Sequence, residues 1–320
     1  MITTRFTKLL GCSAPIQLAA MPGIATPELV AAVSSAGAVG MLPAPMLSAE
    51  VLARTIDELR TLTTGVFGVN FLMPFLDRSC VRVAARGASL VEFFYGEPEA
   101  ALVEEAHGHG ALVSWQVGSV AEALAAERCG CDMVVVQGTE AGGHVRGQTS
   151  LMPLLSAVLG EVRVPVVAAG GIATGSDVAA VLACGASGAR IGTRFVASAQ
   201  SGAHPSYVRA IVDAAAGDTC LTEEFDRPWP HAPHRVLRSA LEAARELDDE
   251  VAGATRVGDD TVPVERFSVM CPTVHTTGRV DAMALYAGES VENVRTVEPA
   301  ADIIADLVAG AETAPARRDS

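Results

Sequence analysis

Eight short apolar segments recur along the first two-thirds of the chain, and this repetition limits the folds that the chain can adopt. Most are continuous runs of Val, Ile, Leu and Ala, a pattern typical of strands buried on both faces of a parallel sheet. The runs span residues 15–20, 38–42, 65–71, 90–94, 111–117, 132–137, 164–170 and 188–192. The sequence therefore predicts a parallel sheet whose two faces are both covered.

Alanine-rich segments with helical spacing of their apolar residues separate these runs. Each begins with a Ser, Thr or Pro, and several end at Gly, which are common start and stop signals of helices. The segments span residues 26–37, 48–62, 98–110, 119–130, 150–160 and 174–185. We expect them to be the helices that cover the sheet.

Strand–helix units that repeat eight times fit a (β/α)8 TIM barrel, an α/β fold in which right-handed crossovers close a parallel sheet. A doubly wound open sheet is the alternative. Against it, the segment after the first run, "PIQLAAMPGIATPEL", contains no G-x-G-x-x-G dinucleotide fingerprint. We expect the barrel to occupy residues 1–205.

The strand–helix alternation stops after the eighth run. Residues 206–295 contain two helical stretches and a proline-rich segment, "DRPWPHAPH", so we predict a largely helical cap or second domain there. Residues 296–320 are predicted to form a final helix that returns to the barrel, followed by a frayed tail.

Charge and cysteine content argue against several partners. The formal charge of -14 disfavours nucleic acid and anionic lipid, because no Lys- or Arg-rich run offsets it. No run approaches the ~18 uninterrupted apolar residues of a membrane span, so we expect a soluble cytoplasmic protein. The seven cysteines are scattered and fit free thiols in a reducing compartment. Cys129 and Cys131 have no second ligand pair nearby, so we expect no metal site.

The sixth run leads directly into a charged, glycine-rich segment, "QGTEAGGHVRG". In a TIM barrel the active site is built from the loops at the carboxyl ends of the strands. Gly142 and Gly143 allow the backbone to approach a planar ligand closely, and His144 can exchange a proton near neutral pH. His144 is therefore the candidate catalytic residue. The alternative is a helix-capping loop that carries a surface histidine.

Two further glycine-rich segments follow the seventh and eighth runs. "AAGGIATG" contains Gly170 and Gly171, and "RIGTRF" contains Gly192 and Thr193. Their backbone N–H groups, aided by a short helix that starts near Thr193, are candidates for a phosphate site. Either segment alone is equally compatible with an ordinary turn.

Polar side chains also stand near the ends of otherwise apolar runs. Asn70 and Gln137 are candidate ligand-binding amides, and the alternative is that each amide caps a loop. Trp115 and Gln116 end the fifth run, and we expect both to face the mouth of the barrel.

The segments "QGTEAGGHVRG", "VPVVAAGGIATGSDVAAVLACGASGARIGTRFVAS" and "SGAHPSY" closely resemble the nitronate monooxygenase family, formerly called 2-nitropropane dioxygenases. The resemblance extends over roughly residues 12–210 and implies an FMN-dependent barrel. It makes His144 the catalytic histidine. The implied FMN-binding residues are Ala20, Met21, Asn70, Gln137, Gly142, Gly170, Gly171, Gly192 and Thr193.

The resemblance implies an oxidoreductase that uses O2 to convert alkyl nitronates, and in some cases nitroalkanes, to a carbonyl compound and nitrite. Enoyl-acyl carrier protein reductase II belongs to the same superfamily and shares these motifs. An NAD(P)H-dependent reductase of enoyl thioesters or quinones is therefore the alternative, and a non-catalytic flavin-binding homologue is a second one. The oligomeric state stays open, with a homodimer as one option.

Overall fold

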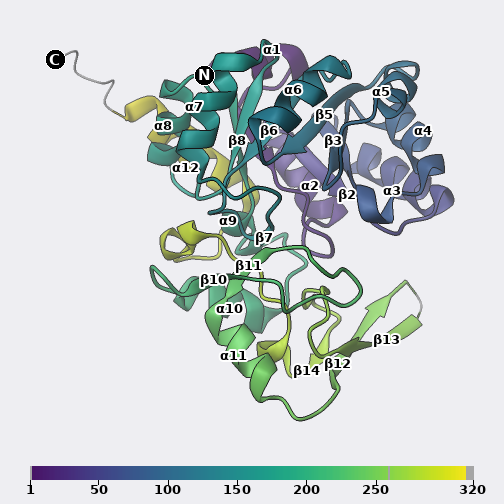
Figure 1. Ribbon diagram of the computed structural model, residues 1–320, viewed down its shortest axis with the longest axis vertical. Helices are drawn as coiled ribbons and strands as arrows, with labels where there is room; N and C mark the ends of the chain where they lie inside the picture. Colours follow the sequence, from purple (N-terminus) through teal and green to yellow (C-terminus); the bar gives the residue numbers. More distant parts are fainter. Residues whose placement is uncertain (1, 259, 315–320) are drawn as a thin grey trace.

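The computed structural model describes residues 2–258 and 260–314, and Figure 1 shows that they form two parts, a barrel above and a cap below. The barrel is an eight-stranded sheet with the strand order β1-β9-β8-β6-β5-β4-β3-β2, and all its strand pairs are parallel. A parallel bridge between Gln17 and Val39 joins β1 to β2 and closes the sheet. The predicted (β/α)8 TIM barrel is confirmed.

Each of the eight predicted apolar runs forms one barrel strand. The strands are β1 (Ile16–Leu18), β2 (Gly40–Pro43), β3 (Phe67–Leu72), β4 (Leu90–Phe94), β5 (Leu112–Val117), β6 (Met133–Gln137), β8 (Val166–Ala169) and β9 (Gly188–Ile191). The two-residue strand β7 (Gly143–His144) lies outside the barrel sheet.

Helices surround this barrel. They are α1 (Arg5–Leu10), α2 (Pro27–Ser35), α3 (Ala49–Leu62), α4 (Arg78–Gly87), α5 (Ala100–His107), α6 (Val120–Arg128), α7 (Leu151–Glu161), α8 (Gly175–Ala183), α9 (Thr193–Val196) and α12 (Ala300–Thr313). Side-chain oxygens of Thr26, Ser48, Ser119 and Thr174 accept a backbone N–H at the start of α2, α3, α6 and α8, as their capping patterns predict. Helices α1 and α4 are additions to the predicted set. Among described residues, none of the helices is both long and apolar enough to cross a membrane.

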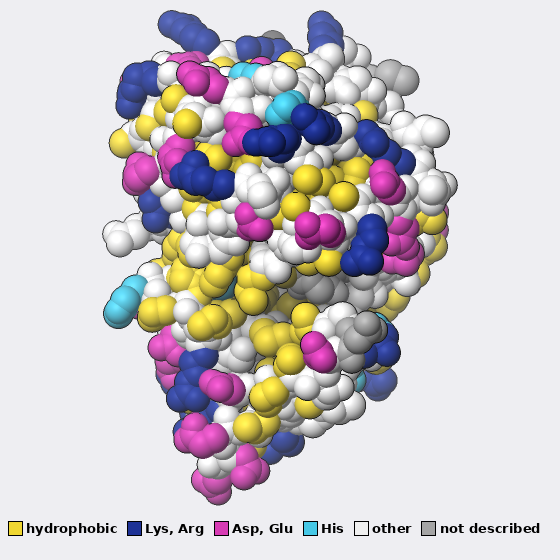
Figure 2. Space-filling model, turned by 90° about the vertical axis from the view of Figure 1, so that its right-hand side faces the viewer, with side chains coloured by type: hydrophobic (Ala, Val, Ile, Leu, Met, Phe, Trp, Pro, Cys, Tyr) yellow, Lys and Arg dark blue, Asp and Glu magenta, His cyan; other side chains and the backbone are white. Residues whose placement is uncertain are grey.

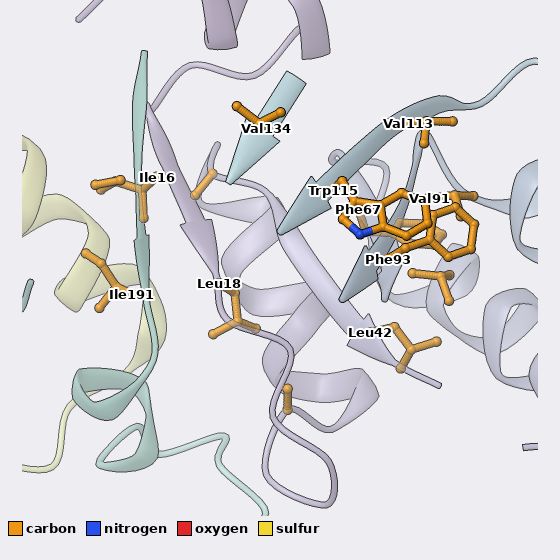
Figure 3. Close-up of a cluster of buried hydrophobic side chains, with 14 of the residues drawn as sticks. Ile16, Leu18, Leu42, Phe67, Val91, Phe93, Val113, Trp115, Val134 and Ile191 are labelled. Carbon is orange, nitrogen blue, oxygen red and sulfur yellow. The ribbon is translucent and has the colours of Figure 1, made fainter. Parts of the chain in front are cut away.

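The barrel sheet has an apolar core on each face. On the outer face, strand side chains pack under the helices, and Figure 3 shows Phe93 and Trp115 of this layer with Val91 and Val113 around them. On the inner face, Met41, Leu90 and Met133 belong to a second cluster together with Phe6 of α1. Helix α1 thereby plugs the amino-terminal end of the barrel, which leaves the opposite end as the mouth.

The cap follows α9 and is a mixed α/β unit, not a largely helical one. Its elements are α10 (Pro205–Asp213), β10 (Thr219–Thr222), β11 (His234–Leu237), α11 (Arg238–Glu246), β12 (Val251–Val257), β13 (Asp260–Glu265), β14 (Thr277–Gly278), η2 (Val280–Ala282) and η3 (Glu289–Asn293). The two predicted helices are present. The strands add one sheet of order β10-β11-β7 and one of order β13-β12-β14. These strands are short or partly exposed, so they lack the buried apolar runs that reveal the barrel strands.

Barrel and cap meet along an apolar band, which Figure 2 shows as hydrophobic side chains gathered between the two parts. The chain leaves the barrel and returns to it at one place. Ala199 donates its N–H to the Glu298 carbonyl over 2.9 Å, and Glu298 donates to the Ala197 carbonyl over 3.2 Å. Helix α12 then packs against α8 and α2. The tail predicted to fray extends beyond residue 314, outside the described residues.

Candidate active site at the barrel mouth

The segment after β6 folds back on the end of its own strand. Gln137, the last residue of β6, donates from Nε2 to the carbonyl of His144 over 2.9 Å. Its Oε1 accepts the N–H of Arg146 over 3.2 Å. Both ends of one buried amide therefore fix the backbone on either side of Val145, and this contact sets the position of His144 at the mouth.

The cap holds the same segment from the other side. His144 and Gly143 form β7, which pairs antiparallel with β11 so that His144 lies opposite His234. Val145 donates its N–H to the Pro233 carbonyl over 2.8 Å. Gly143 has φ of 76°, a left-handed conformation that favours glycine, and a Cβ there would meet open space. The histidine therefore sits where barrel and cap join, next to an open position of the backbone.

The imidazole of His144 lies among aromatic rings. Its ring stacks on the indole of Trp229 with centroids 4.0 Å apart and planes 20° apart. Tyr95, His234 and Tyr286 have ring centroids 6.0, 5.2 and 5.7 Å away, respectively. The Nε2 atom of His144 is buried, and it has no hydrogen-bond partner within the described residues.

Burial among these rings determines the charge of His144. Desolvation lowers its pKa from 6.5 to about 3, and the neighbouring His234 contributes in the same direction. His144 is therefore neutral at physiological pH. A buried, neutral imidazole with an unpartnered nitrogen is equipped to accept a proton or a hydrogen bond from a bound molecule.

Two glycine-rich turns lie at the ends of the neighbouring strands β8 and β9. Gly170 and Gly171 follow β8 with φ of 108° and 69°, and a Cβ on either would come within 3.1–3.2 Å of the 138–141 segment. Gly192 follows β9. In the described part of the chain, the backbone N–H groups of these three glycines donate to no protein acceptor. Three unpaired donors at adjacent strand ends fit an anion.

The remaining predicted contacts of the mouth lie beside these turns. A Cβ on Gly192 would lie 3.6 Å from Met21 Sδ, which places Met21 next to the β9 turn, and Ala20 packs on the inner barrel cluster. Thr193 accepts the N–H of Gly288 at Oγ1 over 3.0 Å, and Gly142 packs so tightly on Gly288 that a Cβ would approach its nitrogen to 2.6 Å. The cap residue Gly288 thus joins the β6 and β9 loops.

Asn70 belongs to a polar network inside the barrel. Its Nδ2 donates to Glu92 Oε1 over 2.8 Å, and Ser114 Oγ donates to Glu92 Oε2 over 3.0 Å. Arg190 forms a buried ion pair with Glu92 and also donates to the side-chain oxygens of Gln116 and Gln17. One polar atom of this network, Gln17 Nε2, has no partner among the described residues.

The expectation that Trp115 and Gln116 both face the mouth is wrong for Trp115. Successive strand residues point to opposite faces of a sheet, so the two side chains diverge. Gln116 points into the barrel and contacts Arg190. Trp115 is fully buried in the outer layer, where its Nε1 donates to the Gly96 carbonyl over 2.9 Å.

The structure thus brings His144, Gln137, Gly142 and the β8 and β9 glycines to one end of the barrel, together with Met21, Ala20 and Thr193. Sequence reasoning missed the aromatic neighbours of His144, chiefly Trp229 and Tyr95, and the Glu92–Arg190 pair. A charged residue in each of two buried apolar strands is a signal for the ion pair. The sequence has no comparable signal for where the proline-rich segment with Trp229 docks.

Comparisons with known proteins show which family and which solved structures this chain is similar to. A family model described as nitronate monooxygenase matches residues 3–80 and 74–310. A probable nitronate monooxygenase of Staphylococcus saprophyticus is 33% identical over 300 residues, covering 78% of this chain and 83% of that protein. The structure of FabK from Thermotoga maritima has a TM-score of 0.82 at 31% identity and covers 98% of this chain and 97% of its own. Nitroalkane oxidase from Streptomyces ansochromogenes has a TM-score of 0.79 at 29% identity, covering 97% and 99%.

Proposed function

Because the chain belongs to the nitronate monooxygenase family, a family of flavin-dependent oxidoreductases, we propose that it oxidises alkyl nitronates, and nitroalkanes, with O2 to a carbonyl compound and nitrite. The observation that carries this proposal is His144. Its Nε2 is buried at the barrel mouth, where three glycine N–H groups also lie, and none of these four groups has a partner among the described residues.

The residues of the mouth fit FMN. The unpaired N–H groups of Gly170, Gly171 and Gly192 suit its single phosphate, with Thr193 beside them. The other proposed contacts are Ala20, Met21, Asn70, Gln137 and Gly142. When bound, FMN supplies the electron acceptor that the oxidation requires and the reductant for O2.

His144 is proposed to act as the base for neutral nitroalkanes. The neutral imidazole accepts the proton of the carbon next to the nitro group at Nε2, and the anion left behind is the nitronate. A buried imidazolium is costly alone, but the nitronate formed beside it supplies the opposite charge that stabilises it. A preformed nitronate needs no base, so it requires His144 only for positioning.

A second candidate function is an NAD(P)H-dependent reductase of enoyl thioesters or quinones. The similarity to FabK over almost the whole chain favours it. The surroundings of His144 favour it too, because Arg146, whose guanidinium lies over the neighbouring Tyr95 ring, is already paired with Glu122 and Glu97 and is not committed to an anionic substrate. A non-catalytic flavin-binding homologue remains the third alternative, and turnover of any of these substrates excludes it.

An anaerobic reduction experiment separates these functions. Purified protein should be yellow, or become so with added FMN, and release FMN on denaturation. Under the proposed function, propyl-2-nitronate bleaches the flavin absorption without NADH or NADPH. Bleaching by NADH or NADPH alone identifies the reductase instead, and a protein that fails to bind FMN contradicts both.

The setting of the reaction is part of the proposal. All seven cysteines are free thiols in the structure, which supports a reducing, cytoplasmic compartment. The partners are small molecules and O2, and a homodimer stays a prediction.

A further inference from the structure

Trp229 belongs to the cap but is buried against the barrel. Its side chain is 8% exposed. The indole stacks on His144, and the rings of Tyr95 and Phe75 meet it edge-on at centroid distances of 4.6 and 5.2 Å. These three contacts come from the segments that follow β6, β4 and β3. One cap side chain therefore covers the candidate base and bridges three barrel loops.

The segment that carries Trp229 is fixed at both ends, and few hydrogen bonds hold the backbone between them. Arg227 donates its N–H to the Phe267 carbonyl over 3.1 Å and accepts the N–H of Val269 over 2.9 Å. At the other end, the Pro233 carbonyl accepts the N–H of Val145. Between these anchors, the backbone N–H groups of Trp229, His231 and Ala232 donate no hydrogen bond within the described chain, whereas the Ala232 carbonyl accepts from His234 Nδ1 over 2.8 Å.

Aromatic contacts thus hold the tip of this segment in place. Proline at positions 228 and 230 removes two backbone donors, and the indole Nε1 of Trp229 makes no hydrogen bond to a described residue. Segments with few hydrogen bonds belong to the regions of a protein that open most easily. The tip can therefore move while its two anchors stay in place.

We propose that Trp229 determines substrate specificity as a lid: its indole occupies the face of His144 on which the flat, conjugated group of a preformed nitronate stacks, and residues 228–231 move aside to admit that substrate. A flat group that replaces the indole keeps the stacking on the imidazole and the edge contacts with Tyr95 and Phe75. A branched, non-planar group does not. The claim that Trp229 selects among substrates rests on the proposed function. The claim that Trp229 covers His144 as a movable lid does not.

The other groups around His144 agree with a slot for a flat group. His234 and Tyr286 border the imidazole on the cap side, and Tyr95 does so on the barrel side. The guanidinium of Arg146 lies over the outer part of this shell, 5.4 Å from the Tyr95 ring centre. The walls next to the imidazole are aromatic rings, which select for shape.

Modification of histidines by diethyl pyrocarbonate, mapped by mass spectrometry, tests the lid without any substrate. The reagent acylates accessible, neutral imidazole nitrogens. His144 should react slowly in the wild-type protein compared with the exposed His275. In Trp229→Ala it should react about tenfold faster, while Trp229→Phe, which keeps a flat ring, should stay close to wild type.

His234 is the matched control, because it is fully buried and lies opposite His144. It should stay protected in every variant. Acylation of His234 together with His144 would show a loosened fold and overturn the proposal. So would a His144 that reacts as slowly in Trp229→Ala as in wild type, or as fast as His275 in wild type. If Trp229→Ala does not fold, Trp229→Leu, which keeps an apolar side chain without a ring, replaces it.

The role of Trp229 in substrate specificity is tested separately, by enzyme kinetics. With the FMN-loaded protein, the ratio of kcat/KM for ethylnitronate to that for cyclohexylnitronate should fall about tenfold in Trp229→Ala, because the bulky substrate gains access. An unchanged ratio overturns the specificity role. If the wild-type protein turns over neither nitronate, the proposed function fails, and the acylation result still decides whether Trp229 is a lid.

Discussion

Polar side chains are buried in two neighbouring regions of this barrel, in its interior and at its mouth, and their surroundings differ. In the interior, the charge of Arg190 is neutralised by Glu92, and Asn70, Ser114 and Gln116 belong to the same network, in which Gln17 Nε2 has no partner among the described residues. At the mouth, His144 is enclosed by rings, and its Nε2 has no partner among the described residues.

This difference distinguishes buried polar side chains that stabilise the fold from those that can react with a bound molecule. A buried ion pair whose two charges neutralise each other offers little to a ligand, and it fixes the strands that carry it. An unpartnered nitrogen costs stability when nothing is bound, and it recovers that cost when a ligand pairs with it. Mutations in the two regions should therefore affect different quantities: activity at the mouth and the free energy of unfolding in the interior.

The largest effect is expected for His144→Asn. Removing the base should lower turnover of neutral nitroethane by about 10²–10⁴-fold, while turnover of preformed ethylnitronate falls much less. Steady-state kinetics with both substrates, at equal FMN occupancy, measure this. An equal loss on both substrates with FMN still bound would mean that His144 positions or binds the substrate and removes no proton.

In the interior, Glu92→Ala should destabilise the fold by about 3–5 kcal/mol, because it leaves the buried Arg190 guanidinium without its counter-charge. Urea unfolding at pH 7, followed by circular dichroism, gives this number. The matched control is Glu92→Gln with Arg190→Gln, which removes both charges but keeps amides in place. It should cost clearly less than the single variant, and an equal cost would mean that packing, not charge, governs this region.

Gln137 holds the mouth segment in place, since its amide donates to the His144 carbonyl and accepts from the Arg146 N–H. Gln137→Leu should lower the free energy of unfolding by about 2 kcal/mol, because two backbone groups lose their partner. Gln137→Glu turns an unpaired, buried carboxylate toward the His144 carbonyl, so it should destabilise the protein at least as much as Gln137→Leu. Urea unfolding of wild type and the two variants, all without FMN, measures this. Equal free energies of unfolding would contradict a stabilising role of the Gln137 hydrogen bonds.

The smallest expected effect is the pH dependence contributed by His144. Its pKa is about 3 in the folded protein and ordinarily 6.5, so the unfolded chain takes up the proton first as the pH falls. Stability from neutral His144 is therefore complete above pH 6.5 and is lost as the pH falls toward 3. Between pH 8 and 5.5 the loss is about 1.4 kcal/mol. The difference in this slope between wild type and His144→Asn measures it, and identical slopes would contradict the low pKa.

The barrel could be predicted from sequence because its strands are buried on both faces. Each strand then reads as a continuous apolar run, which is why all eight were found. Helix α4 was missed because Arg78, Arg82 and Arg86 make its exposed side strongly basic and leave only Cys80, Val81, Ala84 and Ala85 buried. The cap strands gave no such run, since β12 and β13 keep many exposed side chains.

Parts of the mouth could be predicted where the backbone conformation requires glycine. Paired glycines after β6 and β8 marked turns with positive φ, and both turns lie at the strand ends as expected. Trp229 was not predictable in this way. Its position against His144 depends on how the cap docks on the barrel, and long-range docking leaves no local pattern in the sequence.

Backbone hydrogen bonds join the chain at Ala199, where it leaves the barrel, to Glu298, where it returns. The cap is therefore an insertion at a single point of the barrel. Everything from the end of α9 to the start of α12 is one continuous stretch of chain, so a cap of different length or sequence can be inserted there without altering the order of the barrel strands. A replacement cap must still pair with β7 and contact the β6 and β9 loops, as β11 and Gly288 do. The barrel contributes His144 and the glycine turns, and the insert contributes Trp229, so under the proposed lid role one contiguous stretch of the gene determines what the mouth admits.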